Sequence, residues 1–342
     1  MDHYDKYGQL INSELKVLSG QQKQAILTRM NQNEKTIASL VKNKRQTHGN
    51  LQFKSELTCI PLKQYGTTYK FKSFNKVKIQ GIHGGVLVRT GSQLQIADEL
   101  ANANLVKKPD GYYLKITCFI NKENWKIQQT NGKEIGLDFG IKTNITTSEG
   151  KKIDVSVEES ERLKKLQKQM FRQVKGSNNR YKTINKIQRE YQKIGNKKTD
   201  MANKIVHKLK QYSTIVIQDE QVTSWHKDMF GKQVQHSCMG LIKQKLKSLP
   251  QTIVLDKYIP TTKWCPKCWN KHSIGLDKRT YVCECGYQKD RDVHSAKNML
   301  NIKNLVFSSL NISVPTEHRE VTLMEFKTSV KGTGSADDKF EQ

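Results

Sequence analysis

Four cysteines lie within 21 residues of one another, and they constrain how this chain can fold more than any other feature. The sequence reads Cys-Pro-Lys-Cys, then fourteen residues, and then Cys-Glu-Cys. Two cysteine pairs joined by a short hairpin are typical of a tetrahedral thiolate site, and thiolate ligands favour zinc over magnesium. Because four protein ligands leave no position open for a substrate, we expect a structural zinc ion. Its predicted ligands are Cys265, Cys268, Cys283 and Cys285.

The second cysteine pair departs from the usual spacing. Two residues normally intervene, whereas only Glu284 separates these two cysteines. His272 could therefore replace a poorly placed cysteine as a ligand, and unmetallated thiols or another metal are further alternatives. The total of seven cysteines is odd, which argues against a disulfide framework. We expect ordinary thiols at the other three, Cys59, Cys118 and Cys238.

The chain is strongly basic. Its 342 residues include 59 Lys or Arg and 32 Asp or Glu, which gives a formal net charge of +27. A charge of this size attracts polyanions, and each neutralised phosphate releases condensed counterions. We therefore expect a nucleic-acid partner; a basic surface that only maintains solubility is the alternative. No stretch approaches the ~18 apolar residues of a membrane span, and the first residues lack an apolar signal core, so we expect a cytoplasmic protein.

Apolar periodicity predicts an α/β protein with about two domains and small additional modules. The strand predictions rest on short segments rich in β-branched and aromatic residues, and the helix predictions on apolar residues at helical spacing. The expected order is a helical segment over residues 1–48, a small β-barrel or sandwich over 49–132, strands and helices over 133–260, a cysteine ribbon over 261–288, a helix-opening segment over 289–304 and a disordered polar tail over 305–342.

A long basic helical region is predicted over residues 158–211, with a break near the sequence KGSNNR. From Arg162 to Lys210 it contains sixteen Lys or Arg, and its only acids are Glu190 and Asp200. The near absence of acids favours a surface that tracks a phosphate backbone over an ordinary solvated helical face.

Acidic residues occur at the ends of predicted strands and at the start of a predicted helix. Asp138 lies in the apolar strand IGLDFG, Asp219 and Glu220 end the strand STIVIQDE, and Asp290 and Asp292 precede the last helix. Three carboxylates that converge from two strands and a helix can hold two divalent cations, ~3.5–4 Å apart, for phosphodiester cleavage. The alternatives are a turn residue at the first position, a surface acid at the second and a helix N-cap at the third.

These segments resemble a known family. IGLDFGIKTN, IVIQDEQV and DRDVHSAKNML, arranged around the cysteine ribbon, are similar to the three RuvC motifs of TnpB. TnpB proteins are encoded by insertion sequences, have long been described as transposases, and are related to the compact type V CRISPR nucleases. The resemblance covers residues 51 to about 303. It implies an RNase H-like (RuvC) nuclease domain with an inserted zinc ribbon, preceded by a wedge-like β-barrel, in a nucleoid-associated prokaryotic protein.

The resemblance also implies a guide RNA, cleavage of matching target DNA, and two catalytic magnesium or manganese ions. The first-motif aspartate corresponds to Asp138, and the third-motif aspartate to Asp292, with Asp290 as the reserve candidate. Many relatives have glutamate where this chain has Gln218, and strand alternation would place Glu220 on the same face as that residue. We therefore expect Asp138, Glu220 and Asp292 to be the catalytic metal ligands.

Other departures from the family keep rival functions open. His294 and Ser295 replace the more usual Asn-Ala, and the N-terminal segment is expected to be a truncated recognition lobe or part of a degenerate copy. A nuclease-impaired, nucleic-acid-binding relic or guided repressor with the same fold is one alternative. A transposase that joins DNA strands is another. Because Asp292 follows Cys285 by only seven positions, we also expect the ribbon to position the third acid.

Overall fold

The computed structural model describes residues 2–4, 10–12, 19–43, 57–89, 97–121, 130–220, 222, 225, 230–275, 278–310 and 322–329 of the chain. The chain divides into two compact units. The first comprises residues 1–126 together with 319–342, and the second comprises residues 127–318. None of the helices in the described residues is both long and apolar enough to cross a lipid bilayer.

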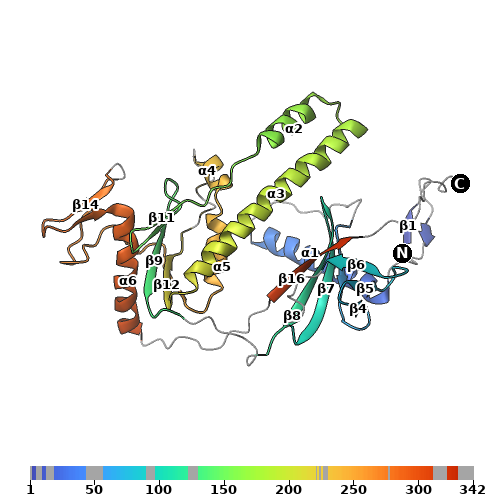
Figure 1. Ribbon diagram of the computed structural model, residues 1–342, viewed down its shortest axis with the longest axis horizontal. Helices are drawn as coiled ribbons and strands as arrows, with labels where there is room; N and C mark the ends of the chain where they lie inside the picture. The colour runs from blue at the N-terminus through green and yellow to red at the C-terminus, as the bar shows by residue number, and fades with distance from the viewer. Residues whose placement is uncertain are drawn as a thin grey trace. The chain divides into compact units, whose positions relative to one another are not determined.

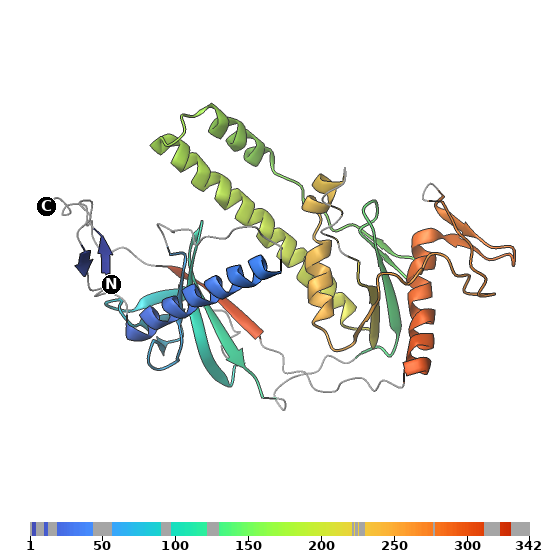
Figure 2. The ribbon, with the colours of Figure 1, turned by 180° about the vertical axis from the view of Figure 1, so that it is seen from behind.

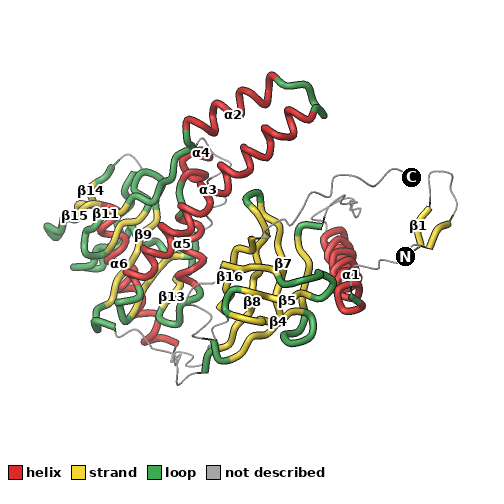
Figure 3. The backbone as a smooth tube through the Cα atoms, turned by 45° about the vertical axis from the view of Figure 1, so that its right-hand side comes forward, coloured by secondary structure: helices red, strands yellow, loops and turns green. Residues whose placement is uncertain are grey.

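The first unit contains a helix and a large antiparallel sheet (Figure 3). Helix α1 (Gly20–Lys42) begins after Ser19, whose side chain accepts from the Gln22 backbone N–H while the Gln22 side chain accepts from the Ser19 N–H. This reciprocal cap satisfies two backbone donors that the first helical turn leaves unpaired. Residues 1–48 were predicted to be helical, and this is wrong for residues 2–4 and 10–12, because β1 (Asp2–Tyr4) pairs with β2 (Leu10–Asn12).

The sheet of the first unit has seven strands in the order β3-β7-β8-β16-β6-β5-β4, and every neighbouring pair is antiparallel. Alternate apolar residues of these strands form one core, which includes Leu62, Val77, Leu114 and Ile116. The expected strands over 49–132 are thus present. No pairing between the edge strands β3 and β4 closes the sheet into the expected barrel among the described residues. The strands are β3 (Cys59–Leu62), β4 (Tyr69–Ser73), β5 (Lys76–Ile79), β6 (Val86–Arg89), β7 (Glu99–Lys108), β8 (Gly111–Phe119) and β16 (Thr322–Ser329).

The C-terminal segment contributes regular structure that the sequence analysis missed. Strand β16 pairs with both β6 and β8 near the centre of the sheet, far along the chain from either partner. Residues 305–310 also continue helix α6 (Arg291–Leu310). The prediction of a disordered tail over residues 305–342 is therefore wrong for these two segments; 311–321 and 330–342 lie outside the described residues. Strand β16 forms its hydrogen bonds with strands that are far away in the sequence, which is why local patterns did not predict it.

The second unit contains a five-stranded mixed sheet in the order β11-β10-β9-β12-β13. Strand β10 pairs antiparallel with both β9 and β11, whereas β12 pairs parallel with both β9 and β13. This arrangement confirms the predicted α/β class and the strands expected over residues 133–260. The strands are β9 (Glu134–Phe139), β10 (Ile145–Thr147), β11 (Lys152–Ile153), β12 (Thr214–Gln218) and β13 (Thr252–Leu255).

Helices cover both faces of this sheet (Figures 1 and 2). Ile135, Leu137 and Phe139 of β9 face a core shared with α3 (Asn178–Leu209) and α5 (Met239–Lys247). On the opposite face, Val216 of β12 packs with Met299 of α6. Since successive strand residues point to opposite faces, Asp138 and Gln218 lie on the face that α6 covers.

Gly136 allows α6 to approach β9 very closely. A β-carbon at this position would lie 2.0 Å from the carbonyl oxygen of Ala296, so any other residue would force the helix away from the strand. The first turn of α6, with Asp292 and Ser295, is thereby held beside Asp138 of the same strand. A glycine two residues before the aspartate is therefore part of how the chain brings its first and third acidic motifs together.

The predicted basic helical region is a hairpin of α2 (Glu161–Arg172) and α3, broken at residues 173–177 as expected from the KGSNNR sequence. Arg180 holds the turn, because its guanidinium donates to the carbonyl oxygens of Met170 at 2.7 Å and Gln173 at 3.0 Å. The hairpin end projects away from the sheet of its own unit (Figure 1). A short helix, α4 (Gly231–His236), precedes α5.

Candidate metal centres

The four cysteines form a compact thiol cluster. Their sulfur atoms all lie within 4.8 Å of one another, and none is in a disulfide. The Cys265–Cys285 and Cys268–Cys283 sulfur pairs are each 3.5 Å apart. Tetrahedral zinc with Zn–S bonds of ~2.3 Å would place sulfurs roughly 3.8 Å apart, so the donor set fits a zinc ion. The one-residue spacing of the second cysteine pair does not keep its sulfurs out of the cluster.

Tight turns bring each cysteine pair together. The Trp269 N–H donates to the carbonyl of Cys265 at 2.9 Å, and the Gly286 N–H donates to the carbonyl of Cys283 at 3.0 Å. Gly286 has a φ of 82°, a left-handed conformation that glycine adopts without strain. The hairpin of β14 (Thr280–Val282) and β15 (Gln288–Asp290) carries the second pair.

His272 lies beside the cluster rather than completing it. Its Nε2 is 3.3 Å from the sulfur of Cys283, but the group of mutually close ligand atoms comprises only the four cysteines. At this distance His272 could donate a hydrogen bond to a metal-bound Cys283 thiolate. Residues beside metal ligands commonly make hydrogen bonds of this kind.

The ribbon is fixed to α6 by one ring stack and one buried amide. His294 is fully buried and stacks on Tyr281 of β14, with ring centroids 3.8 Å apart. Burial lowers the pKa of His294 to about 4, so this ring is neutral at physiological pH. The Asn298 amide donates to the carbonyl oxygens of Thr261 at 2.8 Å and Trp264 at 2.6 Å. These contacts link the metal-binding ribbon to the helix that begins with the third acidic motif.

Asp138 is the centre of the acidic site. Its carboxylate is partly buried on the α6 face of β9, where its Oδ1 accepts from the Ser295 hydroxyl at 2.9 Å. Burial, followed by the nearby carboxylates of Glu220 and Asp292, raises the pKa of Asp138 to about 8, against the opposing effects of Ser295 and Arg291. The three motif acids therefore interact electrostatically, although they come from positions 138, 220 and 292.

Glu220 reaches this site by a turn rather than by strand alternation. Strand β12 ends at Gln218, and the Glu220 N–H then donates to the carbonyl of Gln218 at 2.9 Å. The prediction that alternation continues to Glu220 is wrong in this respect, because a hydrogen bond between residues two apart bends the backbone out of the strand. Asp219 instead pairs with Lys247 at the surface.

The two acids before α6 have different surroundings. Asp290 caps the helix: its Oδ1 accepts from the N–H groups of Asp292 at 3.1 Å and Val293 at 3.2 Å. Its other oxygen pairs with Lys152 at 2.8 Å. Burial opposes ionisation of Asp290, but these hydrogen bonds lower its pKa. The Asp292 carboxylate lies 3.8 Å from the Arg291 guanidinium, and it lies close enough to Asp138 to raise the pKa of Asp138.

The side chain of Gln218 is held by hydrogen bonds to neighbouring parts of the fold. Its side-chain amide donates to the carbonyl oxygens of three loop positions, at distances of 2.7 to 3.3 Å. Its oxygen accepts from the Thr261 hydroxyl at 3.3 Å, and that hydroxyl is 3.0 Å from the Ser295 hydroxyl. A run of closely spaced polar side chains thus connects the residue that replaces the usual glutamate with Asp138. The three carbonyls belong to Asp256, Lys257 and Ile259.

The donor set of the acidic site fits hard divalent cations, which prefer carboxylate oxygens. Clustered carboxylates with little solvent repel one another, and a divalent cation would remove that repulsion. The acids are less tightly gathered than the thiols, since within the described residues only the cysteines bring three or more ligand atoms within 4.8 Å of one another. Binding two ions would therefore draw the three side chains closer together.

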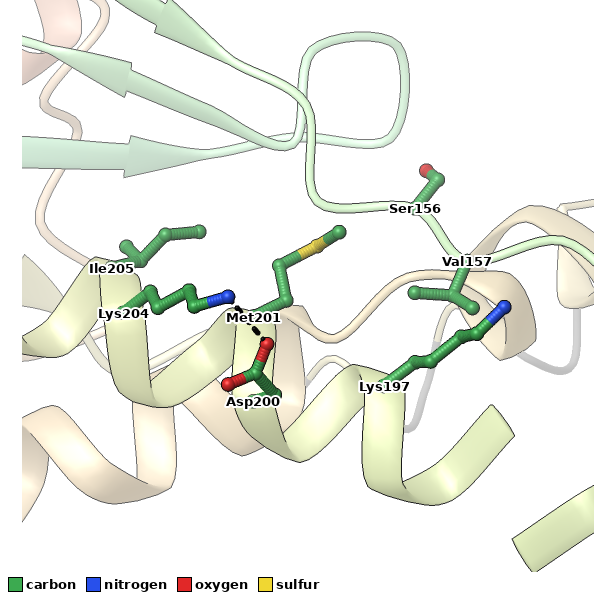
Figure 4. A pocket seen from close by; sticks show the side chains of 7 residues that line it. All are labelled: Ser156, Val157, Lys197, Asp200, Met201, Lys204 and Ile205. Carbon is green, nitrogen blue, oxygen red and sulfur yellow. Dashed lines mark ion pairs between the residues drawn. The ribbon is translucent and has the colours of Figure 1, made fainter. Parts of the chain in front are cut away.

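The sequence analysis missed the residues that support these acids. Ser295 was noted only as a departure from a family pattern, and Lys243, which contacts Glu220, was not singled out. Neither has a sequence signal, since both act through contacts across the fold. A pocket beside α3 lies apart from this chemistry, because none of the three acids lines it (Figure 4). Its lining includes an Asp200–Lys204 ion pair of 2.8 Å, a common i,i+4 helix contact.

Comparisons with known proteins agree with the motifs. Residues 117–224 match the OrfB_IS605 family, described as "Probable transposase", and residues 240–299 match a family described as "Cas12f1-like, TNB domain". A Streptomyces pristinaespiralis protein named "Putative RNA-guided DNA endonuclease" is 29% identical over 177 residues, which cover 48% of this chain and 44% of that relative. The Escherichia coli K12 protein named "Putative RNA-guided DNA endonuclease InsQ" is 34% identical over 101 residues, 28% of this chain and 25% of the relative.

The aligned region spans less than half the length of either curated relative. The first family match contains Asp138 and Glu220, and the second contains all four cysteines and Asp292. Together, these matches confirm over residues 117–224 and 240–299 the resemblance to the TnpB family that the acidic motifs and the cysteine ribbon predicted.

Proposed function

We propose that this chain is an RNA-guided, metal-dependent DNA endonuclease of the TnpB type. The observation that carries the proposal is the placement of three acidic motifs: Asp138 lies in β9, Glu220 follows the neighbouring strand β12, and Asp292 lies in the first turn of α6, whose Ser295 hydroxyl donates to Asp138. The names of the two relatives support the reaction class and its nucleic-acid partners. In this proposal, Asp138, Glu220 and Asp292 are the catalytic residues, and they bind two magnesium or manganese ions.

In this proposal, the side chains of the acidic site hold the divalent ions and set the protonation state of the ligands. Bound divalent ions would supply activation of the attacking water and stabilisation of the leaving oxygen. Asp138 must release its proton to become a ligand, and the Ser295 hydroxyl holds the carboxylate by one oxygen, which leaves the other available. Asp292 projects from the first turn of α6, while Asp290 serves as the cap that begins that helix.

The domain proposals follow the same resemblance. The mixed sheet that carries Asp138 at the end of β9 and Glu220 after β12 is consistent with an RNase H-like (RuvC) domain, divided by the ribbon. The antiparallel sheet of the first unit would serve as the wedge-like domain. The cysteine ribbon would hold one structural zinc ion, and its contacts with α6 would keep Asp292 in position.

The α2–α3 hairpin is the proposed nucleic-acid surface of the second unit. Between residues 162 and 189 there are ten Lys or Arg and no acid. Near its end, the side chains of Phe171 and Tyr181 are 76% and 63% exposed. Exposed aromatic rings among cations suit base stacking beside phosphate contacts. Base pairing by the guide would provide sequence recognition, while the protein would hold the backbone and shape of the duplex.

The proposal is tested by DNA cleavage. The purified protein–RNA complex would be incubated with magnesium and DNA that matches the bound RNA, with scrambled DNA as the control. Magnesium-dependent cleavage of the matched DNA alone, abolished by Asp138→Ala, is expected. No cleavage, or cleavage unaffected by Asp138→Ala, would contradict the nuclease proposal. Sequencing the small RNA that co-purifies tests the guide separately, and recovery of no discrete RNA would contradict guided function of any kind.

A guided, non-cleaving DNA-binding protein is the second candidate. It is favoured by Gln218, which takes the usual glutamate position and is committed to loop carbonyls, and by the ion pair that holds Glu220. A manganese titration separates the two candidates. Two-site binding that Glu220→Gln reduces to one site would reject the non-cleaving alternative, whereas one-site binding in the native chain would favour it.

A further inference from the structure

Lys243 is an unusually buried lysine at the edge of the acidic site. It projects from α5, and its side chain is 5% exposed. Its ammonium donates to the carbonyl oxygen of Glu220 at 3.0 Å and lies 3.4 Å from the Glu220 carboxylate. It also lies 5.1 Å from the centre of the Phe139 ring, the residue next to Asp138. The ammonium is therefore surrounded by the backbone and side chain of one proposed metal ligand and the neighbour of another.

A second lysine on the same helix provides an internal comparison. Lys247 pairs with Asp219, but their side chains are 41% and 53% exposed. Exposed pairs of this kind contribute little to stability because solvent screens them. Lys243 and Glu220 lack that screening, with side-chain exposures of 5% and 28%. Each buried charge therefore depends on the other, since an unpaired buried ion is costly.

Loss of one member of this pair would leave the other ion without its partner in a poorly solvated position. Removing the lysine charge should therefore leave a carboxylate with a strong demand for another cation.

We infer that the Lys243 ammonium occupies the position of a cation at Glu220, so that a divalent ion must displace Lys243 before Glu220 can become its ligand. The inference rests on the proposed role of Glu220 as a metal ligand. No covalent change is involved: one ammonium–carboxylate contact is exchanged for metal–carboxylate contacts. Lys243 is thus a positioning residue that lowers metal affinity at the second motif, and metal binding through Asp138 and Asp292 does not compete with it.

The test measures manganese affinity rather than cleavage. Lys243→Met removes the charge and retains an unbranched apolar side chain, Lys243→Arg retains the charge, and Lys247→Met is the matched surface control. Free manganese would be measured by electron paramagnetic resonance in titrations of the full chain with its zinc retained. We expect Lys243→Met to tighten the Glu220-dependent binding step by about tenfold, because a like charge has been removed from the site. Adding Glu220→Gln should abolish the gain.

Each outcome bears on the inference. Unchanged or weaker manganese binding by Lys243→Met, with wild-type affinity for Lys243→Arg and Lys247→Met, would overturn the displacement inference while leaving the metal site intact. No manganese binding by the native chain or any variant would instead contradict the metal site of the proposed function, and the inference with it. A gain that survives Glu220→Gln would also overturn the inference.

A measurement on the native chain keeps the test decisive if Lys243→Met does not fold. Displacement should expose the Lys243 amine, so saturating manganese should increase its modification by an amine-reactive reagent several-fold, as measured by peptide mass spectrometry. Lys247 provides the internal reference and should react equally with and without manganese. Unchanged reactivity of Lys243 at saturating manganese would overturn the inference.

Discussion

Replacing Asp138 with asparagine should stabilise the metal-depleted protein increasingly as the pH rises. Burial, Glu220 and Asp292 raise the pKa of Asp138 from 3.8 to about 8. Between these two values the folded chain retains a proton that the unfolded chain has released. The raised pKa therefore costs folding free energy progressively from about pH 4 to about pH 8, where the cost levels off. An asparagine side chain at this position could not ionise and would avoid this cost.

The magnitude follows from the linkage between proton binding and folding. Each pKa unit corresponds to about 1.36 kcal/mol. From about pH 6 to about pH 8, Asp138 stays largely protonated in the folded chain and is ionised in the unfolded chain. Over this interval the difference in free energy of unfolding between the variant and the native chain should therefore grow by about 2 kcal/mol. The change with pH is the informative quantity, because lost or new hydrogen bonds of the amide contribute equally at both pH values.

Urea unfolding at the two pH values measures this difference, in buffer depleted of magnesium and manganese but with zinc retained. Asp219→Asn is the matched control. The hydrogen bond from Lys247 lowers the pKa of Asp219, so its carboxylate stays ionised across the range and its variant should show no growing difference. If the Asp138→Asn difference is the same at both pH values, the buried, acid-coupled environment assigned to Asp138 is refuted.

Three further changes test the surrounding structure. Cys283→Ser should lose bound zinc, measured by elemental analysis, and reduce DNA cleavage by displacing Asp292; a variant that loses zinc yet cuts normally would refute this link. Gln218→Glu should lower the free energy of unfolding by about 2 kcal/mol in metal-depleted buffer, because an acceptor replaces the donor that faces three carbonyls; undiminished urea stability would contradict that role. The double variant Lys168→Glu/Arg172→Glu should weaken RNA binding and lower the salt dependence by about 1.5 in log–log slope, and an unchanged slope would exclude these hairpin residues from phosphate contact.

Local sequence patterns were sufficient where structure depends on nearby residues. The cysteine spacing predicted the thiol cluster, and apolar periodicity predicted the hairpin and the strands around Asp138. The family resemblance ranked Asp292 above Asp290, but the roles of these two acids became distinct only through contacts. Asp290 caps the helix because of the way the backbone turns there. It also pairs with Lys152, a residue far away in the sequence.

Long-range contacts explain what the sequence did not reveal. Strand β16 pairs with β8, whose residues lie some two hundred positions earlier, so no local pattern predicts the partner. The bend after Gln218 depends on a hydrogen bond that strand alternation cannot anticipate. Lys243 is one of many lysines in a basic chain, and only burial against Glu220 distinguishes it. The sequence thus indicated the candidate acids, while the fold shows which groups contact them.

DNA cleavage by single variants tests the catalytic assignment most directly. The protein–RNA complex would be given matched DNA and magnesium, with Asp138→Asn, Glu220→Gln and Asp292→Asn compared with the control Asp290→Asn. We expect each of the first three to lose cleavage and Asp290→Asn to retain it, since Asp290 caps α6 rather than facing Asp138. Cleavage that survives Asp138→Asn or Asp292→Asn would contradict the assignment of these acids as the metal ligands of the nuclease site.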